Sequence, residues 1–463
     1  STLVGKLTAA GTPLSVAEKL LPAKELVAKG MAPSVPGAPP QLNAMVATGS
    51  HEAFMAGLQT SMMVGAVAAA VGAVLALGAC DYVKFAMNAP KDRNVLFWSV
   101  EQRDFAFRDL EIIPSLKYNT MKRGGAVHQF APGAVLALKD DAGAGYDVGR
   151  FMANQRAVAL KVVVGDSARL EQFAMGYGPT DRWTSFSVAK SFTSTLLGAA
   201  IRDGYIKNVD QQVKEIIPAF AGTAYDGVTI RQILTMTSGV KWNEDYADPN
   251  SDVAKFDKVK ADPGEEAIVT YMKHLPREAT PGTKWVYKTG ETNLIGAIVM
   301  RATHKSLAQY LGEKVWGPYG MEADGFWVLD TTGKEIGGCC ISGTIGDYAR
   351  FGQFVLDGAK AGGKPVLPDD WIAQATTTRV GIGEKGRGYG YQWWTFADGS
   401  YAARGLFGQG IFIDPARHIV IALQADYPSS KETGLWEERV ALYRAVQRAV
   451  DAEQGVSGRA MVH

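Results

Sequence analysis

The sequence has little cysteine and histidine and almost no net charge, and each shortage excludes a class of protein. Its 463 residues include three cysteines, Cys80, Cys339 and Cys340, which are too few for a disulfide framework. We expect the adjacent Cys339 and Cys340 to pack as thiols, because neighbouring cysteines rarely bond to each other. Six scattered histidines show no metal-ligand spacing, so no metal site is expected. The formal net charge of +1 lacks the basic excess that marks nucleic-acid binding.

Charge is also missing from one long stretch near the N-terminus. Residues 62–80 hold no charged or strongly polar group, and the segment 61–80 is long enough to cross a bilayer as a helix. Most of it is Ala, Gly and Val, so a buried apolar helix is the alternative. Residues 1–60 are a low-complexity segment with a Pro-rich linker. Localisation stays open between membrane attachment through residues 62–80, the cytoplasm and the periplasm.

The pattern of the remaining chain predicts one large domain. Residues 81–150 mix aromatic and charged groups without periodicity and are expected to be a lead-in to a domain over residues 151–455. Two strand-like runs flank Gly165-Asp166, which is a hairpin signal. Helical segments dominate residues 205–345, and strands return late, before a final amphipathic helix. This order predicts an α+β fold, with an antiparallel sheet built from both chain ends, flanking helices and an inserted helical region.

Ser187 and Lys190 are the first candidates for chemistry. Three residues apart on a helix, their side chains lie on one face and can touch. A serine hydroxyl is a poor nucleophile until a base takes its proton, and a lysine kept neutral by burial can do so. A helix start also favours developing negative charge. The chain holds a second S-x-x-K match, Ser238 and Lys241, but Gly239 predicts a turn there and separates the two side chains.

Tyr287 is the candidate that completes a proton path. A phenol hydrogen-bonded to the lysine can pass a proton to the leaving group. Tyr287 follows the Pro281-Gly282 turn and precedes a predicted helix, a loop–helix junction of the kind that displays functional side chains. The alternative is that this tyrosine only packs there.

The chain from about residue 150 to 450 resembles the class C β-lactamase-like serine hydrolases, which include penicillin-binding proteins, family VIII carboxylesterases and 6-aminohexanoate-oligomer hydrolases. Three landmarks carry the resemblance: Ser187-Val-Ala-Lys190, Pro281-Gly-Thr-x-x-x-Tyr287, and Arg404-Gly-Leu-Phe-Gly-Gln409-Gly410. It implies a β-lactamase/transpeptidase-like fold and a Ser187–Lys190–Tyr287 acyl-enzyme mechanism without a cofactor.

Departures from the family pattern narrow the resemblance. The edge strand lacks the Lys-Thr-Gly motif of true β-lactamases, although Arg404 could partly take the place of its lysine. Thr289 stands where the second motif of those enzymes has Asn. The motif Trp242-Asn-Glu-Asp-Tyr246 is most similar to the 6-aminohexanoate-oligomer hydrolase branch, which cleaves amides and small esters. By this resemblance the expected substrate-binding residues are Tyr246, Thr289, Gly408, Gln409 and Gly410, while Tyr246 as a packed loop aromatic is the alternative. The second oxyanion donor is not readable from the sequence.

Three functions remain in competition. The expected one is a serine hydrolase that cleaves amide or ester bonds of small molecules. The alternatives are a β-lactamase or D-alanyl-D-alanine peptidase, and a non-catalytic binding module attached to a membrane. No nucleic-acid partner is expected, and a homodimer is left open.

Overall fold

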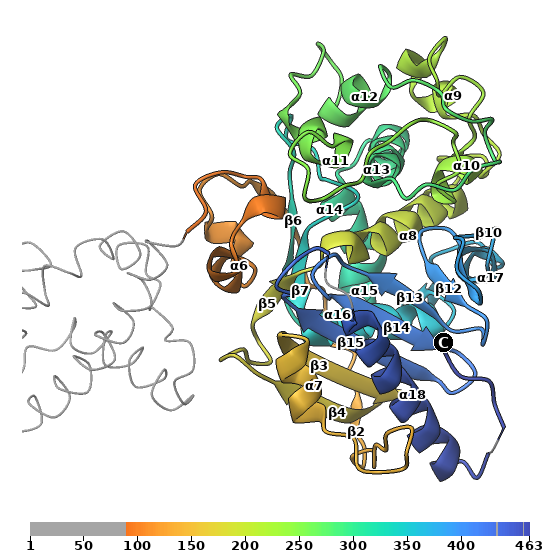
Figure 1. Cartoon of the computed structure of the whole chain (residues 1–463). Coiled ribbons are helices and arrows are strands. Elements are labelled where there is room, and N and C mark those ends of the chain that lie inside the picture. The colour runs from red at the N-terminus through yellow and green to blue at the C-terminus, as the bar shows by residue number, and fades with distance from the viewer. Residues whose placement is uncertain (1–88, 432–433, 457) are drawn as a thin grey trace, which may run out of the picture. The chain divides into compact units, whose positions relative to one another are not determined.

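The computed structural model describes residues 89–431, 434–456 and 458–463. From Pro90 to His463 the chain forms one compact unit (Figure 1). The apolar helix expected at residues 61–80 lies outside the described residues. Within those residues, no helix combines the length and the apolar character that a membrane crossing needs.

A nine-stranded sheet forms the centre of the unit. Its spatial order is β10 (Val380–Gly381), β11 (Arg387–Tyr389), β12 (Trp394–Phe396), β13 (Tyr401–Arg404), β14 (Gly410–Asp414), β15 (Ile419–Ala425), β3 (Ala157–Val164), β4 (Ser167–Phe173) and β2 (Ala131–Pro132). All neighbours are antiparallel except β2 and β4, which are parallel. The β3–β4 hairpin turns at Gly165 and Asp166, which confirms the hairpin predicted from that dipeptide. The late strands pair with the early ones, so both chain ends build the sheet, as predicted (Figure 1).

Helices cover both faces of this sheet. Every residue of β15 is buried, as expected for a strand without a solvent face. One face packs against α7 (Val148–Asn154) and α18 (Leu435–Glu453), in a core that includes Phe412, Ile421 and Tyr443. The other face packs against α16 (Ile345–Leu356), whose Gly352 lies so close to β15 that an added Cβ would meet Val420 at 2.5 Å.

The lead-in also contributes β1 to a second, four-stranded sheet. Its order is β1 (Tyr118–Met121), β6 (Gly325–Val328), β7 (Ile341–Thr344) and β5 (Arg182–Thr184). Before β1 lie η2 (Val95–Phe97), α6 (Val100–Ala106) and η3 (Leu110–Ile112). The α6 helix is fixed by Arg103, whose buried guanidinium donates to Asp426 at 2.6 Å just after β15. A two-stranded ribbon, β8 (Lys360–Ala361) and β9 (Lys364–Pro365), completes the strands.

Helices from the middle of the chain form the inserted region predicted from the sequence (Figure 1). They are η4 (Phe186–Val188), α8 (Ala189–Arg202), α9 (Val213–Ile216), η5 (Pro218–Phe220), α10 (Ile230–Leu234), α11 (Asp252–Lys255), η6 (Phe256–Lys258), α12 (Ala267–Met272), α13 (Thr289–Thr303), α14 (Leu307–Leu311), η7 (Gly312–Trp316) and α15 (Gly317–Tyr319), with α17 (Trp371–Thr376) later in the chain. The α8 helix is buried over most of its length and packs against α13. It ends before Gly204, whose φ of +82° only glycine adopts freely.

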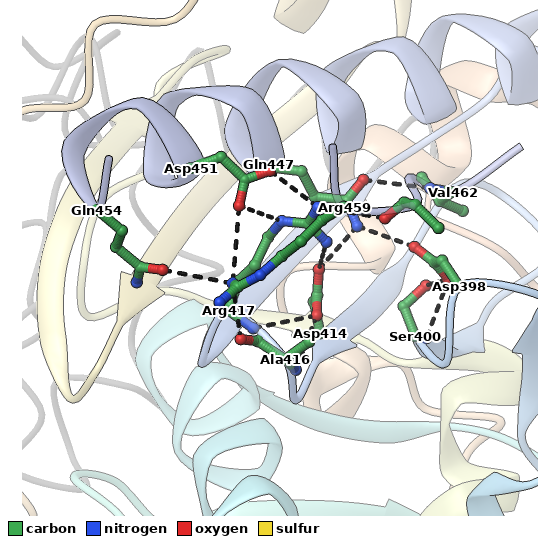
Figure 2. A network of polar contacts seen from close by, with 11 residues as sticks. Asp398, Ser400, Asp414, Ala416, Arg417, Gln447, Asp451, Gln454, Arg459 and Val462 are labelled. Atoms are coloured by element: carbon green, nitrogen blue, oxygen red, sulfur yellow. Dashed lines mark hydrogen bonds and ion pairs between the residues drawn. The ribbon is translucent and has the colours of Figure 1, made fainter. Parts of the chain in front are cut away.

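A buried network of charges ties the C-terminal residues to the sheet (Figure 2). Arg417, in the turn between β14 and β15, donates to Asp451 of α18 at 2.9 and 3.0 Å and to Asp414 at 2.8 Å. Gln447 donates to Asp414 at 2.7 Å and accepts from the backbone of Val462. The Arg417 cluster, which we define as Arg417, Asp414, Asp451 and Gln447, therefore holds α18 and the chain end against the sheet.

Candidate active site

Ser187 lies in η4, between strand β5 and the buried helix α8. The preceding residue, Phe186, has a φ of +43°, which is unusual for a residue with a bulky side chain. Its ring is held by Phe107 and Phe407, with ring centroids 5.0 and 4.9 Å away. Such conformations persist only where the surroundings over-determine them, and they gather at functional sites. Ser187 itself stays partly exposed while both of its neighbours are buried.

Lys190 is buried on the first turn of α8, with an exposed fraction of 1%. Its Nζ donates to Thr289 Oγ1 at 2.9 Å and to the Gly338 carbonyl at 3.0 Å. Burial lowers its pKa to about 8, and the negative charge of Glu244 acts in the opposite direction. A neutral amine has two hydrogens and one lone pair. Because both hydrogens have acceptors, the lone pair is left to take a proton.

Tyr287 lies beside this pair, two residues before α13. The Lys190 Nζ is 5.2 Å from the centre of the Tyr287 ring. Burial and the Glu244 charge raise the pKa of Tyr287, whereas hydrogen bonding from Ser187 lowers it. The phenol therefore keeps its proton at neutral pH and contacts the serine. Three side chains separated by up to a hundred residues in sequence meet at one place.

Glu244 is a site residue that the sequence interpretation did not assign. Its carboxylate accepts hydrogen bonds from the Thr289 amide at 2.9 Å, the Thr289 hydroxyl, the Trp242 indole and, at 2.7 Å, the Tyr246 hydroxyl. The Thr289 hydroxyl has one proton, which it gives to Glu244, so it receives the proton of Lys190. We call Lys190, Thr289 and Glu244 the Lys190 cluster. The only signal in the sequence was the position of Glu244 inside the Trp242–Tyr246 motif.

The predicted substrate-binding residues fall into two groups. Tyr246 and Thr289 line the cleft beside Ser187. The structure does not bring Gly408, Gln409 and Gly410 to that cleft. Gln409 is buried, donating to the Ala425 carbonyl at 3.0 Å and accepting from the Phe407 amide, and Gly410 opens β14. From the same turn, Leu406 lines the cleft instead.

The cleft is mainly apolar, and distant parts of the chain build it. Ser187, Tyr246 and Thr289 form its reactive edge. The other walls come from the lead-in, from the α11–η6 segment and from the chain before β7, and include Val95, Leu96, Leu116, Val253, Phe256, Val328, Ile336 and Cys340. An apolar cleft with a few polar groups at one edge is typical of small-molecule sites.

The expectation of free thiols in this wall is wrong. Cys339 and Cys340 form a disulfide between adjacent residues, and both line the cleft. The Gly338 carbonyl that accepts from Lys190 comes directly before them. Adjacent cysteines rarely bond to each other, and no local signal in the sequence marks this pair as an exception.

The second S-x-x-K match has different surroundings. Ser238 is buried and donates to Glu291, and Lys241 is exposed. The two side chains do not form a pair, as the turn at Gly239 predicted.

Across the part of the chain that the structure describes, no three His, Cys, Asp or Glu side chains are grouped as a metal site requires.

The α+β fold, with its mixed sheet and flanking helices, is that of β-lactamases and penicillin-binding proteins. The Beta-lactamase family pattern matches residues 147–444, more than half of the chain. The chain therefore belongs to the Beta-lactamase family.

Individual relatives refine this assignment. The 6-aminohexanoate-dimer hydrolase of Paenarthrobacter ureafaciens is 29% identical over 311 residues, which cover 64% of this chain and 79% of that protein. A Bacillus anthracis structure, assigned provisionally as a 6-aminohexanoate-dimer hydrolase, aligns with a TM-score of 0.69 at 20% identity, covering 80% of this chain and 99% of that one. A penicillin-binding protein homologue from Caulobacter crescentus aligns with a TM-score of 0.51 at 16% identity. The alignment covers 63% of this chain and 92% of that one. The chain is a β-lactamase-fold hydrolase related to 6-aminohexanoate-dimer hydrolase.

Proposed function

We propose that the protein is a serine hydrolase that cleaves amide or ester bonds of small molecules through an acyl-enzyme on Ser187. The observation that carries the proposal is the Lys190 amine: its two donated hydrogen bonds leave the lone pair free once the proton is lost, and burial lowers the pKa for that loss to about 8. Lys190 takes the Ser187 proton as the hydroxyl oxygen attacks the carbonyl carbon. The tetrahedral intermediate then collapses and the bond to the leaving group breaks.

Tyr287 passes a proton to the departing amine or alcohol, and Lys190 restores the phenol. Water then attacks the acyl-enzyme, with the same groups running in reverse. The phenol is suited to this step because its raised pKa keeps it protonated until the leaving group demands the proton.

The developing oxyanion needs two N–H donors. In the turn after β13, the Gly405, Phe407 and Gly408 amides have acceptors within the turn. The Leu406 amide has no acceptor among the described residues, and Leu406 lines the cleft. The turn lies against η4, since an added Cβ on Gly405 would meet the Ser185 carbonyl at 2.7 Å. We assign the Ser187 and Leu406 amides as the oxyanion donors.

Two features favour substrates with aliphatic chains. The cleft walls are apolar, and a relative is named for the hydrolysis of 6-aminohexanoate dimer. The first substrates to test are therefore that dimer and short-chain p-nitrophenyl esters, with nitrocefin included to detect β-lactam hydrolysis.

The deciding experiment replaces Ser187 with alanine. We expect Ser187→Ala to lose roughly 10³-fold or more in kcat/KM and to stop reacting with a fluorophosphonate probe. Ser238→Ala, in the second S-x-x-K match, is the matched control and should keep both properties per folded molecule. Wild-type turnover by Ser187→Ala, or a wild-type protein that neither reacts with the probe nor hydrolyses any of these substrates, would rule out the proposal.

A further inference from the structure

The Cys339–Cys340 disulfide directly follows a carbonyl that holds the Lys190 amine. Lys190 Nζ donates to the Gly338 carbonyl at 3.0 Å, and the Gly338 amide donates to Asn293 Oδ1 at 2.7 Å. The fit is tight, since a Cβ added to Gly338 would lie 3.0 Å from Lys190 Nζ and 2.8 Å from the Thr289 methyl group. A small movement of this backbone therefore removes one of the two acceptors of the amine.

The residue that follows the disulfide contacts the chain beside the candidate nucleophile. Ile341, the first residue of β7, accepts from the Ser185 amide at 2.7 Å. Its own amide donates to the Ser185 hydroxyl at 2.9 Å. Ser185 lies two residues before Ser187 in the chain. The bridge thus joins the two residues that separate the Lys190 contact from the Ser185 contact, and it limits how far these contacts can move relative to each other.

The backbone of the bridge has a conformation that needs support. Cys340 has a φ of +72°, in the left-handed region that residues with a side chain rarely adopt. Such a conformation persists only where the surroundings hold it in place. The ring closed by the disulfide contains a single peptide bond, so it restricts the backbone angles of both cysteines. Opening the ring removes this restraint and leaves hydrogen bonds such as the one from the Trp327 indole to the Cys339 carbonyl at 3.1 Å.

A reductant can reach the bridge through the cleft. Both cysteines line the cleft, and Cys339 is partly exposed whereas Cys340 is 3% exposed. A thiolate of a dithiol attacks the Cys339 sulfur, the S–S bond breaks, and the Cys340 sulfur leaves with the electron pair and takes a proton. The second thiol of the reductant then attacks the mixed disulfide and releases Cys339 as a thiol. Two electrons and two protons pass to the protein, and the dithiol becomes a disulfide.

We propose that the Cys339–Cys340 bridge is a redox-sensitive positioning element of the active site, whose reduction by a dithiol reversibly lowers turnover. The inference rests on the proposed function, because Lys190 needs a fixed acceptor for catalysis only if it is the base. In the oxidised protein the bridge holds Gly338 against Lys190 and Ile341 against Ser185. In the reduced protein the segment relaxes, and the amine loses an acceptor that orients its lone pair.

The test compares oxidised protein with protein that has been reduced by dithiothreitol and freed of it without air. Reduction should lower kcat/KM for a short-chain p-nitrophenyl ester roughly 10-fold, because a small misplacement of a catalytic group is costly. Reoxidation should restore the activity. The double variant Cys339→Ser, Cys340→Ser should match the reduced protein and respond to neither treatment. If this variant does not fold, reduced wild-type protein with a native circular dichroism spectrum takes its place.

Cys80→Ser, which removes the remaining cysteine of the chain, is the matched control. It should keep the full response to reduction, and thiol titration should count no thiol before reduction and two after it. Turnover that stays unchanged when both thiols have appeared would overturn the inference. So would an equal response to dithiothreitol in the double serine variant.

The pH profile distinguishes positioning from a general loosening of the site. Among the described residues, Glu244 and Tyr287 are the titratable groups that face Lys190, and neither belongs to the disulfide segment. A carbonyl acceptor favours the charged amine, so losing it should lower the pKa of Lys190 while the activity plateau falls. Water entering a loosened site would instead raise this pKa towards 10.5 and would contradict the inference.

The same pKa can be measured without turnover, which separates the inference from the proposed function. In Ser187→Ala protein, the carbon NMR signal of Lys190 Cε reports the titration of the amine, and its loss in Lys190→Met assigns it. A lower pKa after reduction would support the inference even if no substrate were hydrolysed, a result that would count against the hydrolase proposal alone. An unchanged pKa after reduction would overturn the inference even in an active enzyme.

Discussion

The Lys190 cluster and the Arg417 cluster each bury a cation almost completely, but they supply it with different partners. Arg417 is 1% exposed and contacts two carboxylates. Burial lowers its pKa, but the bonds to Asp451 and Asp414 prevail and raise it. Lys190 is equally buried and contacts only a hydroxyl and a carbonyl, so burial prevails. The number of carboxylates in contact, rather than depth, decides whether a buried cation is a structural ion or an acid–base group.

The largest effect is expected from Lys190→Met, which removes the base and keeps the shape. We expect kcat/KM to fall by roughly 10³-fold or more, because the proposed mechanism assigns Lys190 as the base that takes the Ser187 proton. The free energy of unfolding at pH 7 should rise rather than fall. The pKa of Lys190 drops from 10.5 to about 8 on folding, which corresponds to a cost on the order of 3 kcal/mol below pH 8.

The sign of this effect can be checked by pH. The unfolded chain holds the Lys190 proton more tightly, so stability lost to the buried amine is recovered as pH rises from about 8 towards 10.5. The advantage of Lys190→Met in thermal unfolding should therefore shrink by pH 10. Lys241→Met, the exposed lysine of the second match, is the control and should change neither activity nor stability. A destabilised Lys190→Met protein at pH 7 would contradict this account.

Arg417→Met should have the opposite effects: it should lower the free energy of unfolding and leave activity unchanged. It leaves Asp414 and Asp451 buried without their cation, which typically costs about 3–5 kcal/mol. Urea unfolding should show this loss, while kcat/KM per folded molecule stays unchanged. Arg459→Met removes a more exposed arginine of the same network and should cost less than about 1 kcal/mol (Figure 2). Loss of turnover by folded Arg417→Met would show that the two clusters are coupled.

The sequence predicted the parts of the site that local patterns carry. The Ser187–Lys190 spacing places both residues on one helical turn, and the Gly165-Asp166 hairpin orders the first strands. Tyr287 was predictable as a site residue because it lies both at a loop–helix junction and in the Pro281-Gly-Thr-x-x-x-Tyr287 landmark of the family. Each of these inferences uses residues that are neighbours in sequence.

Features that depend on contacts between distant segments were not predictable. Glu244 reaches the Lys190 cluster only because Thr289, forty-five residues later, folds against it. Gln409 was expected to meet substrate, yet its amide turns inward to the Ala425 carbonyl. The lead-in had no periodicity to show that Val95 and Leu96 would line the cleft. Such contacts are set by tertiary packing, which spacing along the chain does not encode.

Glu244 gives the smallest expected effect in the comparison of the two clusters. Its carboxylate does not contact Lys190 but accepts from the Thr289 hydroxyl, to which Lys190 donates. Its charge raises the pKa of Lys190 against the effect of burial, without contacting the amine. In Glu244→Gln, the Thr289 amide and the Trp242 indole can only donate, so the glutamine oxygen must face them. The glutamine NH₂ then faces the hydroxyls of Thr289 and Tyr246, which have to accept from it. The Thr289 proton is released and can compete with Ser187 for the lysine lone pair.

We therefore expect two small, separable changes in Glu244→Gln. The rate constant kcat/KM rises with pH as Lys190 loses its proton, and this rise should move to lower pH because the charge that held the proton is gone. The plateau at high pH should fall a few-fold because of the rearranged Thr289 hydroxyl. Asp245→Asn makes the same charge change at the exposed neighbouring residue and should leave the profile in place. A rise that moves to higher pH in Glu244→Gln would mean that Glu244 does not act on the base through its charge.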